Sequence, residues 1–193
     1  FKLSNMSKGK IRIIGGKWKG KKISFTLDKD IRPTPDKAKE TLFNWLGQNL
    51  NQFSCLDLFA GTGAMGLESL SRNAEKVIFV EKNKYLVDGL IKTISELECE
   101  DDTEVFNQDC VKWLKSNSPK NPFDLIFVDP PFNKSYAKKV FDEIKRNNFL
   151  VENSIVYLEC EKSLDVSFLE DSFTIFKEKS YGEKSYRLLR KII

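Results

Sequence analysis

The feature that most restricts the fold of this chain is an apolar run that ends at two consecutive prolines, within Phe123–Phe132. Leu125–Val128 has the length and composition of a strand that is buried on both faces of a parallel sheet. Pro130 and Pro131 lack an N–H group for the sheet ladder, and each disfavours helix in the residue before it. The sequence therefore predicts a buried strand that stops at Asp129, at the sheet edge where open α/β sheets bind ligands.

The groups at this strand end suit chemistry on the exocyclic amino group of a nucleobase. Such a nitrogen is a weak nucleophile because its lone pair is delocalised into the ring, and acceptors on its two N–H bonds favour the pyramidal form. Asp129 and the Pro130 carbonyl can supply both acceptors, and the Phe132 ring can stack on the base. The same residues, with Pro131, are equally compatible with an ordinary strand end that Asp129 caps as a solvated carboxylate.

A glycine-rich turn lies inside a strand–turn–helix–strand unit. The strand, the helix and the second strand are predicted, in this order, at Phe53–Phe59, Ala64–Arg72 and Lys76–Val80. The glycines of Ala60–Gly66 allow a ligand to approach the backbone, and the following helix offers free N–H groups. Glu81 lies 20 residues after Gly61, the spacing at which an acid binds two ribose hydroxyls. The unit predicts a nucleoside-bearing cofactor, with tight packing of the glycines as the alternative.

Two cofactors are compatible with this turn. A nicotinamide dehydrogenase usually needs a proton relay through histidine or a Tyr-x-x-x-Lys helix, and the chain has neither. Asp57 precedes the turn, where an acid suits a cationic sulfonium and disfavours a pyrophosphate. These residues favour S-adenosylmethionine. The residues expected to contact it in this unit are Asp57, Phe59, Ala60, Gly61, Thr62, Gly63, Glu81 and Lys82.

Asp109 and Cys110 follow a third predicted strand, Thr103–Phe106. Asp109 can accept a hydrogen bond from an adenine amino group, while backbone atoms near Cys110 complete the contact. Asp109 can equally cap a helix at Cys110–Ser116, and the two roles can coexist.

The remaining segments complete a doubly wound α/β pattern. Two further helices, a strand and a pair of antiparallel strands are expected at Asn83–Leu97, Tyr136–Arg146, Ser154–Cys160, Ser172–Lys179 and Ser185–Ile192. Tyr181–Lys184 is predicted to join the last two strands as a hairpin. We interpret Glu159 and Glu161, which flank the end of the strand Ser154–Cys160, as solvated or structural.

An amphipathic helix is expected before the glycine-rich unit. Thr34 followed by Pro35 predicts the N-cap and the first helical position. The apolar residues of this helix recur at helical spacing: Ala38, Leu42, Trp45 and Leu46. Arg32 lies just before the cap and could reach a cofactor carboxylate or a phosphate.

The first 27 residues form a basic arm with eight Lys or Arg side chains and no acid, whereas the whole chain has a net charge of +4. Residues 28–193 therefore carry a net charge of −4. A basic arm on an acidic body indicates a polyanionic partner, the alternative being a solvated tail. Gly15 and Gly16 predict a two-residue hairpin turn between Lys10–Ile14 and Lys17–Ser24, with Trp18 available to stack on a base.

The histidine and cysteine content narrows the chemistry further. The chain has no histidine, and its cysteines lack the spacing of metal ligands: Cys55, Cys99, Cys110 and Cys160. Histidine-based mechanisms are excluded, no metal is expected, and scattered thiols suit a reducing cytoplasm. No apolar run is long enough to span a membrane, and residues 1–10 lack the apolar core of a signal peptide.

Several segments together resemble a known enzyme family. The similarity to the cofactor and amino-methylation motifs of class I methyltransferases is carried by Asp57–Gly63, Glu81, Asp109 and Asp129–Phe132. Residues 12–20 and 32–44 resemble the RsmD family of small-subunit ribosomal RNA guanine-N2 methyltransferases, and the resemblance runs from about residue 10 to the C-terminus. It implies a Rossmann-like, doubly wound, seven-stranded and mostly parallel sheet with an antiparallel last strand.

The resemblance also implies a function for each part of the chain. Residues 1–30 are expected to form the basic hairpin, and residues 31–193 a methyltransferase domain that binds S-adenosylmethionine and methylates N2 of a guanine. The residues expected to contact 16S ribosomal RNA through the arm are Arg12, Lys17, Trp18, Lys19, Lys21 and Lys22, and those that complete the cofactor site are Arg32, Thr34, Asp109, Cys110 and Asp129.

The expected partner is the small ribosomal subunit or its assembly intermediate, and a cytoplasmic monomer is expected. Three alternatives remain at this point: an adenine-N6 methyltransferase acting on DNA or RNA, an oxidoreductase that uses NAD, and a non-catalytic RNA-binding module.

Overall fold

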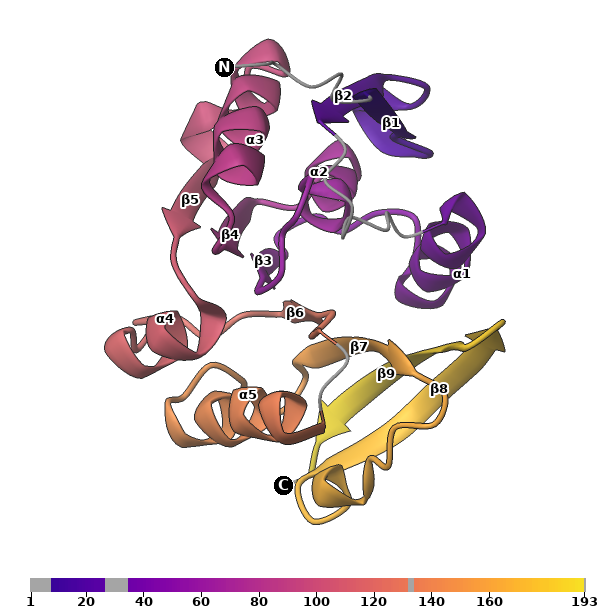
Figure 1. Cartoon of the computed structure of the whole chain (residues 1–193), viewed down its shortest axis with the longest axis vertical. Coiled ribbons are helices and arrows are strands. Elements are labelled where there is room, and N and C mark those ends of the chain that lie inside the picture. The colour runs from indigo at the N-terminus through magenta and orange to yellow at the C-terminus, as the bar shows by residue number, and fades with distance from the viewer. Residues whose placement is uncertain (1–7, 27–34, 132–133, 193) are drawn as a thin grey trace, which may run out of the picture.

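The computed structural model describes residues 8–26, 35–131 and 134–192. Its centre is a seven-stranded sheet with the order β5-β4-β3-β6-β7-β9-β8 (Figure 1). The strands are β3 (Ser54–Asp57), β4 (Lys76–Glu81), β5 (Thr103–Asn107), β6 (Leu125–Val128), β7 (Ile155–Glu161), β8 (Phe173–Tyr181) and β9 (Lys184–Lys191). Strands β3 to β7 pair in parallel, and β9 is antiparallel to both of its neighbours. The predicted sheet with an antiparallel last strand is confirmed.

Helices cover both faces of this sheet, as expected for a doubly wound fold. They are α1 (Asp36–Leu46), α2 (Ala64–Ser71), α3 (Lys84–Glu96), α4 (Cys110–Ser116) and α5 (Lys134–Arg146), with short 3-10 turns at Gly16–Trp18, Glu100–Asp102 and Ser167–Leu169. Apolar residues of α1, α2 and α3 belong to one core cluster, and those of α4 and α5 to a second. Among the described residues, no helix is long and apolar enough to cross a membrane.

Strand β6 lies at the centre of the sheet and joins the two clusters. All four of its residues are buried. Because side chains alternate along a strand, Leu125 and Phe127 face the cluster beneath α1–α3, whereas Ile126 and Val128 face the one beneath α4 and α5. This double burial explains the uninterrupted apolar run, and the strand ends before Asp129, as predicted.

Helix α1 begins one residue later than expected. Pro35 is the N-cap residue, with φ −59° and ψ 146°, and the helix starts at Asp36. An extended Pro35 leaves Asp36 to occupy the first turn, where a carboxylate favours the positive end of the helix dipole. Thr34, the predicted cap, lies outside the described residues.

The basic arm forms a hairpin of β1 (Lys8–Arg12) and β2 (Lys22–Thr26). The prediction of a two-residue turn at Gly15 and Gly16 is wrong, because the connection runs over residues 13–21 and includes a 3-10 turn. Gly16 has φ +69°, and a Cβ atom there would overlap the Ser71 carbonyl group. Glycine is therefore needed for the close approach of this connection to α2.

Trp18 corrects a second expectation about the arm. Its side chain is only 8% exposed and belongs to the core cluster beneath α1–α3. Its backbone N–H group donates to the Ser71 hydroxyl at 2.9 Å. The indole therefore anchors the hairpin connection on α2, and the prediction that it is available to stack on a base is wrong.

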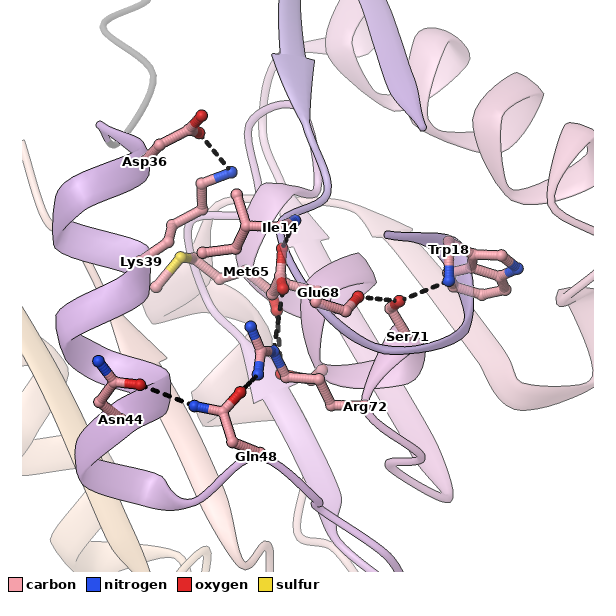
Figure 2. A network of polar contacts seen from close by, with 12 residues as sticks. Ile14, Trp18, Asp36, Lys39, Asn44, Gln48, Met65, Glu68, Ser71 and Arg72 are labelled. Carbon is pink, nitrogen blue, oxygen red and sulfur yellow. Dashed lines mark hydrogen bonds and ion pairs between the residues drawn. The ribbon is translucent and has the colours of Figure 1, made fainter. Parts of the chain in front are cut away.

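Figure 2 shows the polar network that attaches this connection to α2. The Glu68 carboxylate, which is fully buried, accepts the Ile14 N–H group and the Arg72 Nε–H group, each at 2.9 Å. Arg72 also donates to the Gln48 side chain and lies over the Phe43 ring, 4.6 Å from its centroid. The hairpin is thus held through buried charge as well as apolar packing.

Candidate active site

Three carboxylates lie at the carboxyl ends of adjacent strands. Asp57 is the last residue of β3, Glu81 is the last of β4, and Asp129 directly follows β6. Because β3 lies between β4 and β6, with all three parallel, these groups share one sheet edge. This edge, at the point where the strand order reverses beside β3, is where doubly wound sheets bind ligands.

The glycine-rich turn between β3 and α2 lies at this edge of the sheet and is held there by backbone hydrogen bonds. The Gly63 N–H group donates to the Ala60 carbonyl at 2.6 Å, and the Ala60 N–H group donates to the Val80 carbonyl at 3.1 Å. Gly61 and Gly63 have φ values of +54° and +80°, a region that glycine adopts without strain.

The three glycines of the turn have different surroundings. A Cβ atom on Gly63 would overlap Leu90, and one on Gly66 would overlap Phe79. Both positions are thus explained by packing against the core. A Cβ atom on Gly61 would come no closer than 3.9 Å to another described atom, the Phe59 carbonyl oxygen. Gly61 therefore leaves room above the turn for an external ligand.

The Glu81 side chain is fixed by backbone groups. Its two oxygens accept the Gly61 N–H and Asn83 N–H groups, each at 2.8 Å. A carboxylate oxygen can accept more than one hydrogen bond, so both oxygens keep capacity for ribose hydroxyls. The bond to Gly61 ties the acid to the turn, and the ribose contact expected from the spacing of the two residues stays a prediction.

The Asp57 carboxylate is 3% exposed and accepts the Gly66 N–H group at 3.3 Å. Burial raises the pKa of Asp57 to about 7, and the bond from Gly66 lowers it only in part. A buried carboxylate of this kind gains from a nearby cation, because opposite charge offsets the loss of hydration. The site thus suits a positively charged ligand better than a pyrophosphate.

Asp109 caps α4 and also contacts α5. One of its oxygens accepts the Lys112 N–H group at 3.0 Å, and the other accepts the Tyr136 hydroxyl at 2.6 Å. Burial opposes ionisation, but the bonds from Tyr136 and Lys112 outweigh it, so that the pKa of Asp109 lies below its usual value. The capping role is confirmed, and the adenine contact stays a prediction.

Tyr136 was missed as a site residue, because its place at a helix start carried no functional signal in the sequence. Its ring meets the Phe59 ring edge-on, with centroids 6.1 Å apart, and its hydroxyl lies 3.6 Å from the Cys110 sulfur. Phe59, Asp109 and Cys110, three predicted cofactor residues, are therefore joined by one side chain that the sequence did not single out.

Asp129 lies beside a buried acid that was also missed. Glu159 on β7 is fully buried, accepts the Tyr157 hydroxyl at 3.2 Å, and forms an ion pair with Lys184 of β9. Burial and the Glu159 charge raise the pKa of Asp129 to about 8, and Lys184 lowers it in part. Of the two roles left open for Glu159, solvated or structural, the structure supports the structural one.

The remaining predicted residues fall into three groups. Ala60 and Thr62 are buried in the turn, Lys82 is exposed beyond β4, and Pro130 is buried whereas Pro131 is exposed. Arg32, Thr34 and Phe132 lie outside the described residues. The predicted RNA contacts of the hairpin other than Trp18 have exposed side chains, namely Arg12, Lys17, Lys19, Lys21 and Lys22, and Arg12 pairs with Asp36 of α1 at 3.3 Å. No group of three possible metal ligands occurs within residues 8–26, 35–131 and 134–192.

The sheet order, the glycine turn after β3 and the acids at the ends of β3, β4 and β6 define a Rossmann-like methyltransferase. Similar proteins agree with this class. The ribosomal RNA small subunit methyltransferase D of Haemophilus influenzae is 41% identical over 183 residues, 94% of each chain. The Escherichia coli protein of the same name is 33% identical over 190 residues, 98% of this chain and 94% of that one.

A solved structure and a family model extend the match. The Escherichia coli protein yhhF, which carries a provisional methyltransferase assignment, superposes with a TM-score of 0.84 and 34% identity, over 95% of this chain and 98% of that one. The family model described as conserved hypothetical protein 95 matches residues 11–190. The chain belongs to the ribosomal RNA small subunit methyltransferase D family.

Proposed function

We propose that this chain methylates the exocyclic N2 amino group of a guanine in small-subunit ribosomal RNA, with S-adenosylmethionine as the methyl donor. The observation that carries the proposal is the position of Asp129, at the same sheet edge as the open glycine turn and next to the buried Asp57. An acceptor for an amino group and a site for a cationic donor are thereby neighbours. The names of the relatives support ribosomal RNA as the substrate.

The described residues fit S-adenosylmethionine. The open face of Gly61 admits a ligand against the backbone, Glu81 can bind ribose hydroxyls, and Asp57 favours a positive charge. Asp109 and the backbone near Cys110 would hold the adenine, and Arg32 and Thr34 are proposed to complete the site. When bound, this cofactor supplies an electrophilic methyl group on a sulfonium centre.

The protein's part in the reaction is positioning and hydrogen bonding. The Asp129 carboxylate and the Pro130 carbonyl accept the two N–H bonds of the amino group and hold its lone pair toward the donor. Pro130 and Pro131 stiffen this turn, since neither can rotate freely about φ. Phe132 is proposed to stack on the base. The arrangement needs no histidine or metal ion.

The basic hairpin is proposed to contact the RNA backbone. Its exposed side chains, Arg12, Lys17, Lys19, Lys21 and Lys22, project from an element that is anchored on α2. Anchoring lowers the conformational entropy that the arm loses when it binds. We propose that residues 1–30 serve as this arm and residues 31–193 as the methyltransferase domain, and that a cytoplasmic monomer acts on the small subunit or its assembly intermediate.

The catalytic assignment is tested by replacing Asp129 with Ala and with Asn. Asp129→Ala should lower turnover on small-subunit particles that lack the modification by roughly 10²-fold or more, because one preorganised polar contact is lost, whereas Asp129→Asn keeps one acceptor oxygen and should lose less. Cofactor affinity, measured by calorimetry, should barely change. Asp142→Asn is the matched control, because Asp142 pairs with Lys138 and Lys145 on α5. Turnover of Asp129→Ala near that of the control would refute the assignment.

The same assay identifies the product. Nucleoside mapping should find N2-methylguanosine, whereas N6-methyladenosine would assign the chain to adenine methylation instead. If S-adenosylmethionine does not bind, the methyltransferase assignment is refuted, and a non-catalytic RNA-binding module or an oxidoreductase that uses NAD becomes the alternative.

The arm is tested through the salt dependence of RNA binding. Replacing Lys17, Lys19, Lys21 and Lys22 with Gln should reduce the slope of log affinity against log salt by about 0.7–0.9 per lost phosphate contact. The control replaces four lysines that have acidic partners on α3 and α5: Lys84, Lys92, Lys138 and Lys145. It removes the same charge and should leave the slope unchanged. Equal slopes for the arm variant and the wild type would refute the proposed contact between the hairpin and the RNA backbone.

A further inference from the structure

A second carboxylate, that of Glu159, lies on the strand next to Asp129. Val128 of β6 is paired with Leu158 of β7, so Asp129, which directly follows β6, lies beside Glu159 of β7. Two residues earlier, Phe127 and Tyr157 contact each other on the α1 face of the sheet, with ring centroids 6.0 Å apart. Since side chains repeat every second residue along a strand, Asp129 and Glu159 face the same side.

Lys184 supplies one positive charge to these two acids. It comes from β9, forms an ion pair with the buried Glu159 carboxylate, and is itself 22% exposed. The titratable groups whose charges act together with Asp129 are Asp57 on β3, Tyr157, Glu159 and Cys160 on β7, and Lys184 and Tyr186 on β9. Asp129, Glu159 and Lys184 together carry a net charge of −1 when all are ionised.

This pair is poorly explained as a device for stability. Taking a carboxylate and an ammonium group out of water costs about as much as their attraction returns, so a buried ion pair contributes little net stability. Its effect on a third group is larger, because a like charge at close range makes Asp129 harder to ionise. That effect is seen in Asp129, where burial and Glu159 raise the pKa to about 8.

Building on the proposed function, we infer that Glu159 and Lys184 are positioning residues that set the proton affinity of Asp129, which accepts the proton released by the methylated amino group. In this step an N–H bond of the amino group breaks, an O–H bond forms on Asp129, and the electron pair stays on nitrogen. Asp129 then returns the proton to solvent. Glu159 makes the carboxylate a better acceptor, and Lys184 keeps enough of it ionised to bind the amino group.

Opposite shifts in pH dependence test this role. In single-turnover methylation of small-subunit particles, activity should rise with pH through the ionisation of Asp129. Glu159→Gln removes the like charge and should move this midpoint down by about one pH unit, whereas Lys184→Gln should move it up. Lys184→Arg keeps the charge and should retain the wild-type midpoint.

Titration of the Asp129 carboxyl group in the absence of substrate tests the same control by Glu159 and Lys184. In protein labelled with [13C]aspartate, the Asp129 resonance is identified by its loss in Asp129→Asn and followed against pH. The control is Glu143→Gln, because Glu143 is a 5% exposed carboxylate on α5 that pairs with Arg146. It should leave the Asp129 midpoint unchanged.

A purely structural pair would lower activity equally at every pH and leave both midpoints in place, and that result overturns the inference. If Glu159→Gln does not fold, the two Lys184 variants decide the question in the same way. Methylation of another base by the wild type would refute the proposed function, while the carboxyl titration would still decide whether Glu159 and Lys184 control Asp129.

Discussion

The buried pair of Glu68 and Arg72 makes a sharp prediction about how the basic hairpin is held. The two side chains are 0% and 4% exposed, and Glu68 also accepts the Ile14 N–H group of the hairpin (Figure 2). Glu68→Gln leaves Arg72 charged in the interior and puts an amide N–H₂ group opposite hydrogen-bond donors. Breaking a buried pair by removing one partner typically costs about 3–5 kcal/mol.

The lower end of this range is expected here. Arg72 keeps its bond to Gln48 and its contact with the Phe43 ring, and the glutamine that replaces Glu68 would keep one side-chain oxygen as an acceptor. A loss of about 3 kcal/mol is a large part of the 5–15 kcal/mol that is typical for a folded domain. For a chain of this size it corresponds to a fall of roughly 6–12 °C in melting temperature.

Urea unfolding followed by tryptophan fluorescence measures the loss. The matched control is Glu104→Gln, because Glu104 pairs with Lys76 while both side chains are 45% exposed, and it should cost under about 1 kcal/mol. Adding Arg72→Met to Glu68→Gln removes the unpaired buried charge and should recover part of the loss.

Hydrogen exchange shows whether the hairpin itself is released. The Ile14 amide should exchange faster in Glu68→Gln than in the wild type, because its acceptor has changed. A loss below about 1 kcal/mol, or a double variant no more stable than Glu68→Gln, would refute a role for buried charge in holding the hairpin.

Two further outcomes follow from the same structure. Gly16→Ala should lower the free energy of unfolding by more than about 2 kcal/mol, because Gly16 has φ +69° and a Cβ atom there would overlap the Ser71 carbonyl. Gly20→Ala, at φ +88° with no atom near the added Cβ, should lower it by only about 1–2 kcal/mol. Equal losses in urea unfolding would contradict the close approach of the connection to α2. The ligand-free protein should lose stability as the pH rises from about 4 to about 7, because folded Asp57 keeps its proton to about pH 7 and unfolded Asp57 releases it near 3.9. Asp57→Asn should remove up to about 4 kcal/mol of this decline, and an unchanged pH dependence would show that Asp57 ionises normally.

Much of the sheet could be predicted because the burial of a strand leaves a pattern of apolar residues in the sequence. A strand that is covered on both faces, such as β6, reads as an uninterrupted apolar run, and the order of strands and helices then restricts the topology. The hairpin connection could not be predicted in the same way. Gly15 and Gly16 resemble a tight turn, and only the fold shows that α2 lies against them with the Ser71 carbonyl in close contact.

The cofactor side of the candidate site was easier to anticipate than the arm. Glu81 and Gly61 stand at a spacing set by one strand–turn–helix–strand unit, and the structure places them in contact, whereas the ribose contact expected from that spacing stays a prediction. Trp18 had no such local rule. An aromatic residue among lysines is equally compatible with an exposed stacking surface and a buried anchor, and the choice depends on Ser71 in α2, 53 residues away in the sequence.

The role of Glu159 could not be predicted from its position near the end of a strand. In sequence, an acid near the end of a strand is compatible with a solvated or a structural role, because its partners are far along the chain: Lys184 follows Glu159 by 25 residues, and Asp129 precedes it by 30. The antiparallel insertion of β9 beside β7 brings Lys184 to Glu159, while the parallel pairing of β6 and β7 brings Asp129. The charge on the proposed catalytic acid is thus set by strand order, which no local motif contains.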